Sequence, residues 1–205
     1  MVNKYKIFDY FIIVSRFLLA IVFIQYGYSK LTQGQFGLSV EELAKPVKEL
    51  SLMQIGWFLF DQQPFKAFIG VSQIICGILL LLNRTVLIGA LLFLPIAINI
   101  LIINLTIMPK GLANPLTGRF ILYILLDLLI FYHYRIQTIN ACQVITQKTK
   151  PKFKHKIWLY LIVPVLALIL EFTPALPALL HGFITQPGEM WSLIKETIGL
   201  VSKNL

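Results

Sequence analysis

Residues 15–30 of this chain read SRFLLAIVFIQYGYSK, and the fold follows from this stretch. It belongs to an apolar run from Phe8 to Tyr28, which has the length of about 20 residues that a membrane-spanning helix needs. Arg16 lies inside the run, and a charged side chain at membrane depth needs a partner, a route to the surface or a function. The stretch therefore predicts a spanning first helix, with Arg16 as a candidate functional residue.

The composition of the whole chain supports a membrane protein. Of its 205 residues, 58% are hydrophobic and 13% are charged, which is outside the balance of soluble globular domains. The net charge of +9 comes from basic residues beside apolar runs, so we expect contacts with the lipid bilayer and no nucleic-acid binding. Cys76 and Cys142 are far apart, and the sequence predicts neither a metal site nor a catalytic residue.

Three further apolar runs complete a predicted bundle of four spanning helices. The four runs are residues 8–28, 64–82, 86–108 and 119–134. The polar residues 83–85 are the only break between the second and third runs, so we expect these two helices to form a tight hairpin. Pro109 and Pro115 lie close together before the fourth run, which predicts a loop without a helix there.

The remaining segments lie outside these four runs. Residues 31–63 are amphipathic, Ser39 is placed as a helix N-cap, and the stretch that contains Trp57 is too short to cross a membrane alone. A hydrophilic segment, 136–156, precedes a fifth apolar run that begins at Ile157. We therefore expect an all-α, polytopic membrane helical bundle with four core transmembrane helices and a fifth C-terminal span.

The expected domain organisation has three parts. They are a four-helix membrane bundle with its amphipathic outer loop (1–135), a basic cytoplasmic linker (136–156), and a fifth apolar span with an amphipathic, helical tail (157–205). Basic residues without acids in the linker indicate the cytoplasmic side, and alternation of the spans places the N-terminus on that side too. Pro164 interrupts the fifth run, so a half-inserted surface helix is the alternative to a full span.

Arg16 has a candidate partner at its own depth. At about 1.5 Å per residue, Arg16 and Asp127 each lie about 12 Å above the inner ends of their spans, and Gln73 lies at about 13 Å. The depths predict a buried ion pair between Arg16 and Asp127 that Gln73 bridges or caps. There are three alternatives. The pair could serve only to fix helix register, the Arg16 side chain could reach the inner headgroups beside Asp9, or these residues could form a binding or proton-handling site.

A second polar layer lies toward the outer ends of the spans. It contains Gln25, Tyr26, Tyr28, Asn99, Asn104, Arg119 and Tyr123. Donors on Tyr, Gln and Arg side chains suit the carbonyl oxygens of a quinone headgroup, so quinone is the candidate ligand. The candidate quinone pocket consists of Gln25, Tyr26, Asn99, Arg119 and Tyr123. An aromatic belt with ordinary interhelical amide hydrogen bonds is the alternative.

Two spans carry motifs that resemble those of the DoxX-like integral membrane proteins, over about residues 8–135. The motif positions are Arg16, Gly27 and Lys30 in the first span, and Gln73 and Gly77 in the second. The resemblance implies a four-helix bundle in a bacterial cytoplasmic (inner) membrane. It also implies roles in thiosulfate-to-quinone electron transfer, in membrane oxidoreductase complexes or in chaperoning other membrane proteins. Many members have glutamate at the position of Gln73, which leaves Asp127 as the candidate proton carrier of the core.

Three hypotheses for the function follow. The first is a small accessory subunit of a quinone-linked membrane oxidoreductase system, in which a protein partner supplies the redox centre because this sequence has no self-contained catalytic motif. The second is a non-catalytic assembly or chaperone-like partner that docks through residues 31–63 and the C-terminal helix. The third is a small-molecule or anion transporter with Arg16 as the anion site, which the lack of an inverted repeat disfavours.

Overall fold

The computed structural model describes residues 4–32, 34–147, 154, 156–192 and 195. The chain divides into two compact units, 1–147 and 148–205, and each is described by itself. The described residues form helices and no strands. By length and composition, four helical segments are long and apolar enough to cross a membrane, and the count is five if a bent pair of helices is one span. The predicted all-α membrane bundle, with its additional C-terminal span, is confirmed.

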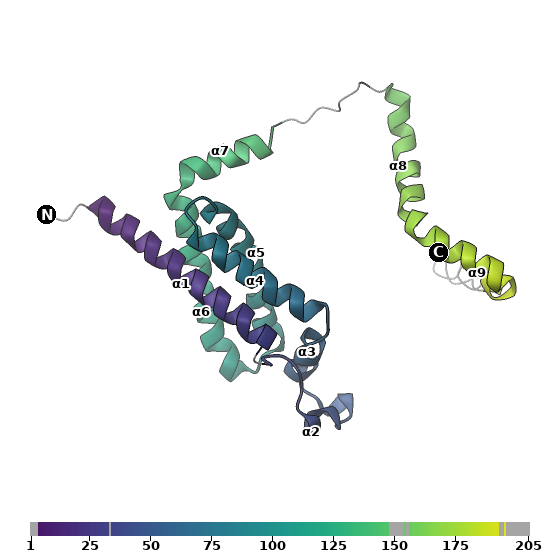
Figure 1. The fold of residues 1–205 in the computed structure, drawn as a ribbon, viewed down its shortest axis with the longest axis horizontal. Coiled ribbons are helices and arrows are strands. Elements are labelled where there is room, and N and C mark those ends of the chain that lie inside the picture. Colours follow the sequence, from purple (N-terminus) through teal and green to yellow (C-terminus); the bar gives the residue numbers. More distant parts are fainter. Residues whose placement is uncertain (1–3, 33, 148–153, 155, 193–194, 196–205) are drawn as a thin grey trace. The chain divides into compact units, whose positions relative to one another are not determined.

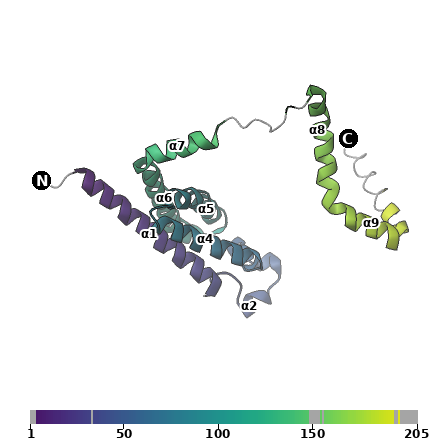
Figure 2. The ribbon, with the colours of Figure 1, turned by 45° about the horizontal axis from the view of Figure 1, so that its top comes forward.

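Four helices of the first unit form the bundle. They are α1 (Lys4–Thr32), α4 (Phe65–Leu81), α5 (Val86–Ile107) and α6 (Lys110–His133). The helices pack as a closed ring, since α4 lies against α1 and α5, and α6 lies against α5 and α1 (Figures 1 and 2). The buried rings of Phe23 and Phe93 meet at the centre, with their centroids 4.0 Å apart.

Helices α1 and α4 approach each other most closely, and glycines permit this contact. A Cβ atom on Gly27 would collide with the carbonyl oxygen of Gly70, and one on Gly77 would lie 2.7 Å from the carbonyl oxygen of Ala20. Larger residues at these positions would force the two backbones apart. The motif positions Gly27 and Gly77 therefore have a packing role.

The predicted hairpin between α4 and α5 is present. Thr85 closes it by donating a hydrogen bond of 3.0 Å to the carbonyl oxygen of Leu79 in the last turn of α4. We call this end of the bundle the turn end. The start of α1 and the end of α6 lie at the same end, because Phe8 and Asp9 of α1 contact His133, and Arg16 contacts both the turn and Tyr134.

The prediction of a loop without a helix between Pro109 and Pro115 was wrong. Helix α6 begins at Lys110, with Pro109 as its N-cap residue. The carbonyl oxygen of Pro109 accepts hydrogen bonds from Leu112 and Ala113, which starts the first turn. Pro115 lies inside the helix, in its second turn, where it removes one intrahelical hydrogen bond without ending the helix.

The opposite end, which we call the loop end, carries α2 (Val40–Leu43), the 3-10 turn η1 (Val47–Glu49) and α3 (Leu52–Phe60). The predicted N-cap is confirmed: Ser39 and Glu42 form a reciprocal capping box. The backbone N–H of Ser39 donates to the Glu42 carboxylate and, with a side-chain hydrogen bond from Gln54, lowers the pKa of Glu42 below its usual range.

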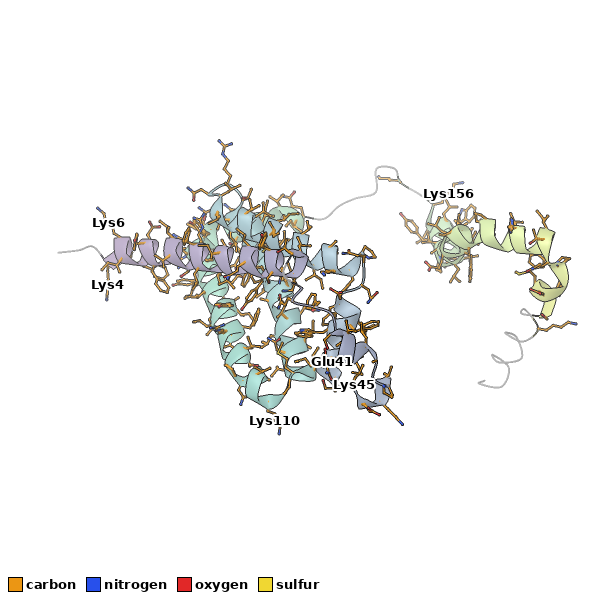
Figure 3. The ribbon with its side chains drawn as sticks, turned by 60° about the horizontal axis from the view of Figure 1, so that its bottom comes forward. Lys4, Lys6, Glu41, Lys45, Lys110 and Lys156 are labelled. Atoms are coloured by element: carbon orange, nitrogen blue, oxygen red, sulfur yellow. The ribbon has the colours of Figure 1, made fainter. Side chains whose placement is uncertain are left out.

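Helix α3 does not continue into α4. The two helices are bent by 81°, so α3 lies across the loop end and forms a broken or re-entrant span with α4. Gly37, in a backbone conformation with φ of +101°, donates its N–H to the carbonyl oxygen of Trp57 at 3.0 Å. That bond ties the segment after α1 to α3, at the end of the bundle away from Lys4 and Lys6 (Figure 3).

The remaining helices follow the bundle in the chain. Helix α7 (Arg135–Ile145) covers the first half of the predicted linker and is the last helix of the first unit. The second unit contains α8 (Ile157–Phe172), η2 (Thr173–Ala175) and α9 (Leu176–Thr185). Its described span, 157–175, buries none of its residues inside the structure. Almost all of the predicted C-terminal amphipathic helix lies outside the described residues.

Candidate functional site

Four of the five residues of the candidate quinone pocket line one cavity near the loop end. Gln25 and Tyr26 come from α1, whereas Arg119 and Tyr123 come from α6. Arg119 and Tyr123 are four positions apart, so both lie on the same face of their helix. The cavity has a volume of about 440 Å³, and its other lining residues are Val22, Tyr28, Ser29 and Gln35. We call it the Tyr26 groove.

Asn99 lies elsewhere. It lines the neighbouring cavity that Lys30 also lines, and its side chain is exposed. The buried face of α5 contains Phe93 and Ala97, and a residue two positions after Ala97 is rotated by about 200° around the helix. The depth of Asn99 matched the outer polar layer, but its angular position directs it away from the Tyr26 groove.

The Tyr26 groove combines hydrogen-bond donors with aromatic walls. The side chains of Gln25 and Arg119 are exposed at the mouth, and Tyr123 is buried behind them. Tyr26, Tyr28 and Tyr123 supply the aromatic part of the lining, and the ring of Phe120 has its centroid 6.2 Å from that of Tyr26 and 5.7 Å from that of Tyr123. Guanidinium, amide and phenol groups donate to carbonyl oxygens, and aromatic rings pack against a planar headgroup.

The predicted ion pair between Arg16 and Asp127 is not present in the structure. The Arg16 guanidinium instead donates four hydrogen bonds at the turn end, toward α4 and the end of α6. They reach the carbonyl oxygens of Leu80 (3.1 Å) and Leu81 (3.2 Å), Oδ1 of Asn83 (3.0 Å) and the hydroxyl of Tyr134 (3.3 Å). Arg16 is 5% exposed, so these bonds form away from bulk solvent.

Arg16 extends toward the end of α4 because that end offers carbonyl groups that need donors. The last carbonyls of a helix have no partner within it, and they carry the negative end of the helix dipole. A guanidinium offers five N–H donors in a planar fork, which matches several neighbouring carbonyls better than one carboxylate at the same depth. Arg16 therefore caps α4 and fastens the hairpin turn to α1.

Asp127 and Gln73 are buried, as predicted, but they are not joined to Arg16 or to each other. Both side chains are 0% exposed, and neither carboxylate oxygen of Asp127 nor either amide atom of Gln73 has a hydrogen-bond partner in the structure. Such orphaned buried groups are uncommon in folded proteins. They remain two separate polar positions in the core rather than a cluster with Arg16.

Sequence reasoning did not single out the surroundings of Lys30. This side chain is 6% exposed and lines a second cavity at the loop end, together with Phe36 and Trp57. The sequence indicates Lys30 only as a motif position, and Trp57 only as part of a re-entrant or interfacial stretch that is too short to cross a membrane alone. The positive φ at Gly37 that folds these aromatic residues back onto α1 had no signal beyond the glycine itself.

Metal ligation finds no support in the described part of the chain, where no group of three or more His, Cys, Asp and Glu side chains could hold a metal ion. At the turn end, Nε2 of His133 lies 3.1 Å from Oδ1 of Asp9. Cys76 is buried and Cys142 is exposed.

Comparison with known proteins gives one family-model match, which covers part of the bundle. Residues 11–105, from within α1 to within α5, match the DoxX family model. The uncharacterized protein YwoB of Bacillus subtilis (strain 168) is 37% identical over 90 residues, which are 43% of this chain and 57% of YwoB. The match thus spans little more than half of that relative. No solved structure gives a significant match.

Proposed function

We propose that this membrane protein is a small accessory subunit of a quinone-linked oxidoreductase system, and that the Tyr26 groove binds the quinone headgroup. The observation that supports this most directly is the meeting of Gln25, Tyr26, Arg119 and Tyr123 around one cavity. Arg119 and Tyr123 lie beyond the residues that match the DoxX family model, so the groove would combine one wall from the matched region with one wall particular to α6. A protein partner would supply the redox centre.

The proposed orientation follows from the distribution of basic residues. Lys4, Lys6 and Arg84 belong to the turn end, and the segment 136–156 after α6 contains basic residues and no acids. By the positive-inside rule, the turn end, the N-terminus and the linker 136–156 face the cytoplasm of a bacterial cell. The Tyr26 groove then opens near the outer surface of the cytoplasmic membrane.

Equilibrium binding tests this proposal. The full-length protein in nanodiscs is titrated with short-chain benzoquinone and naphthoquinone analogues, and the same titration is made for the double variant Tyr26→Phe with Arg119→Gln. Loss of two donors should weaken binding by at least about tenfold, since each lost hydrogen bond is worth about 1 kcal/mol or more. Arg84→Gln, which removes an exposed cation at the turn end, is the matched control. Equal affinities of the double variant and the control would contradict the proposal.

A second candidate function is that of an assembly partner. The apolar α8 has no buried residue within its own unit, so its surface is available to lipid or to another membrane protein. Site-specific photocrosslinking from Trp158 in native membranes should capture a stoichiometric protein partner if α8 docks. Crosslinks to lipid alone would leave this hypothesis without support.

A further inference from the structure

The cavity around Lys30 adjoins the Tyr26 groove, because Gln35 lines both, but the other lining residues of the two differ. It lies at the loop end among α1, α3, α4 and α5, and has a volume of about 380 Å³, within the range of about 300–1,000 Å³ of small-molecule sites. Its walls are mostly aromatic and aliphatic and include Trp57, Phe60, Ile96 and Ile100. Phe68 is 71% exposed at the rim, so the cavity opens between α4 and α5 on the side that faces lipid in a membrane.

Lys30 is a buried cation without a carboxylate in this cavity. Its ammonium group has three N–H donors, yet its described hydrogen bonding consists of one long contact of 3.5 Å to the carbonyl oxygen of Tyr26. The rings of Tyr26 and Phe36 lie 5.3 and 5.5 Å from Nζ. No acid among the described residues forms an ion pair with Lys30; Asp61, the acid beside Gly37, pairs instead with Lys66 at 2.6 Å.

A second unsatisfied donor lines the same cavity. The side chain of Asn104 on α5 is 3% exposed, and its Nδ2 has no hydrogen-bond partner in the structure. A buried amide donor without a partner loses its hydration and gains nothing in return. The cavity therefore presents a positive charge and a free N–H group, and a ligand with anionic oxygens would satisfy both.

We infer that the Lys30 cavity binds an amphipathic anion: a carboxylate or phosphate headgroup against Lys30 and Asn104, with an alkyl chain along the aromatic and aliphatic walls. Charge selects this class of ligand, because a neutral ligand would leave the ammonium group uncompensated. The apolar walls and the opening toward lipid select an alkyl chain over a small soluble anion. A free fatty acid and an anionic phospholipid share this chemistry.

A quenching experiment tests the inference with the full-length chain. Trp57 lies in the cavity wall, and Trp158→Phe with Trp191→Phe leaves it as the sole tryptophan of the protein. In phosphatidylcholine nanodiscs, stearate brominated in mid-chain should quench Trp57 fluorescence saturably, because bromine quenches on contact. A second arm uses brominated phosphatidylglycerol. The methyl ester of the brominated stearate, with the same chain and no charge, is the control ligand.

The expected result is saturable quenching by at least one of the two anions and a response at least about tenfold weaker for the ester. Quenching by stearate alone identifies the free acid as the source, and quenching by phosphatidylglycerol alone identifies the phospholipid; both results support an anion site. Equal quenching by the ester and the acid, or no saturable quenching by either anion, would overturn the inference.

Two variants separate the site from the rest of the loop end. Lys30→Met should weaken quenching by the anion about tenfold, and Asn104→Leu should weaken it severalfold, so the test does not depend on one variant folding. Arg119→Gln removes a cation from the Tyr26 groove and should leave the quenching unchanged. Unchanged affinity in both Lys30→Met and Asn104→Leu would also overturn the inference. Since quinone binding in the Tyr26 groove is measured separately, either proposal can fail without the other.

Discussion

Arg16 and Lys30 are two buried cations on the same helix, and they differ in how their donors are used. They are 5% and 6% exposed, and lie about 21 Å apart along α1. Arg16 donates four hydrogen bonds to groups of α4, the turn and Tyr134, whereas Lys30 makes one long hydrogen bond and faces two aromatic rings. Burial of a charge is therefore a poor guide to a binding site, and unused donors beside a cavity are a better one.

The largest effect on stability is expected from Arg16→Met, which keeps an apolar side chain of similar length but removes every donor. The carbonyls of Leu80 and Leu81 and the amide of Asn83 would lose their charged partner, at a cost of about 3 kcal/mol in the free energy of unfolding. Reversible unfolding in mixed micelles measures this difference.

Arg84→Met is the matched control, because Arg84 is exposed at the same turn and should change the free energy of unfolding by less than about 0.5 kcal/mol. Equal losses in the free energy of unfolding for Arg16→Met and Arg84→Met would show that the Arg16 cap on α4 does not stabilise the fold. Arg16 would then have no structural role to set against the unused donors of Lys30.

An intermediate effect is expected from Gly27→Ala, one helical turn before Lys30. The new Cβ would press against the carbonyl oxygen of Gly70 and separate α1 from α4, which costs about 1–3 kcal/mol. The same substitution at Gly118, where a Cβ meets open space, should be neutral or stabilising by up to about 1 kcal/mol. Both variants are compared by unfolding in the same micelles, and a loss at Gly118 as large as that at Gly27 would contradict the close-contact explanation.

Much of the fold could be predicted because the apolar runs and polar breaks have the lengths of helices and turns. The hairpin at 83–85, the N-cap at Ser39 and the burial of Asp127 follow from such local patterns. The start of α6 did not follow, because Pro109 precedes the first helical residue, where a proline costs little, and the helix continues through Pro115.

The candidate site could be predicted only in part. Distance along a helix predicts the depth of a residue, and Gln25 and Arg119, which were predicted at one level, line one cavity. It gives neither the angular position that separates Asn99 from them nor the direction in which the Arg16 side chain extends. The Lys30 cavity depends on a segment that folds back across the loop end, and such long-range contacts have no local sequence pattern.

The smallest effect on stability is expected from Lys30→Met, and this variant sharpens the comparison with Arg16 most directly. The substitution removes cation–π contacts worth about 0.5–2 kcal/mol, but it also removes the cost of keeping an ammonium group away from water without a carboxylate. These terms oppose each other, so the free energy of unfolding should stay within about 1 kcal/mol of the unmodified protein in ligand-free micelles. Added fatty acid should then stabilise the unmodified protein and not the variant, because a ligand stabilises only the state that binds it. If Lys30→Met lowered the free energy of unfolding in ligand-free micelles as much as Arg16→Met does, Lys30 would stabilise the fold as strongly as Arg16. Its burial would then have a structural explanation, and the contrast between the two cations would be lost.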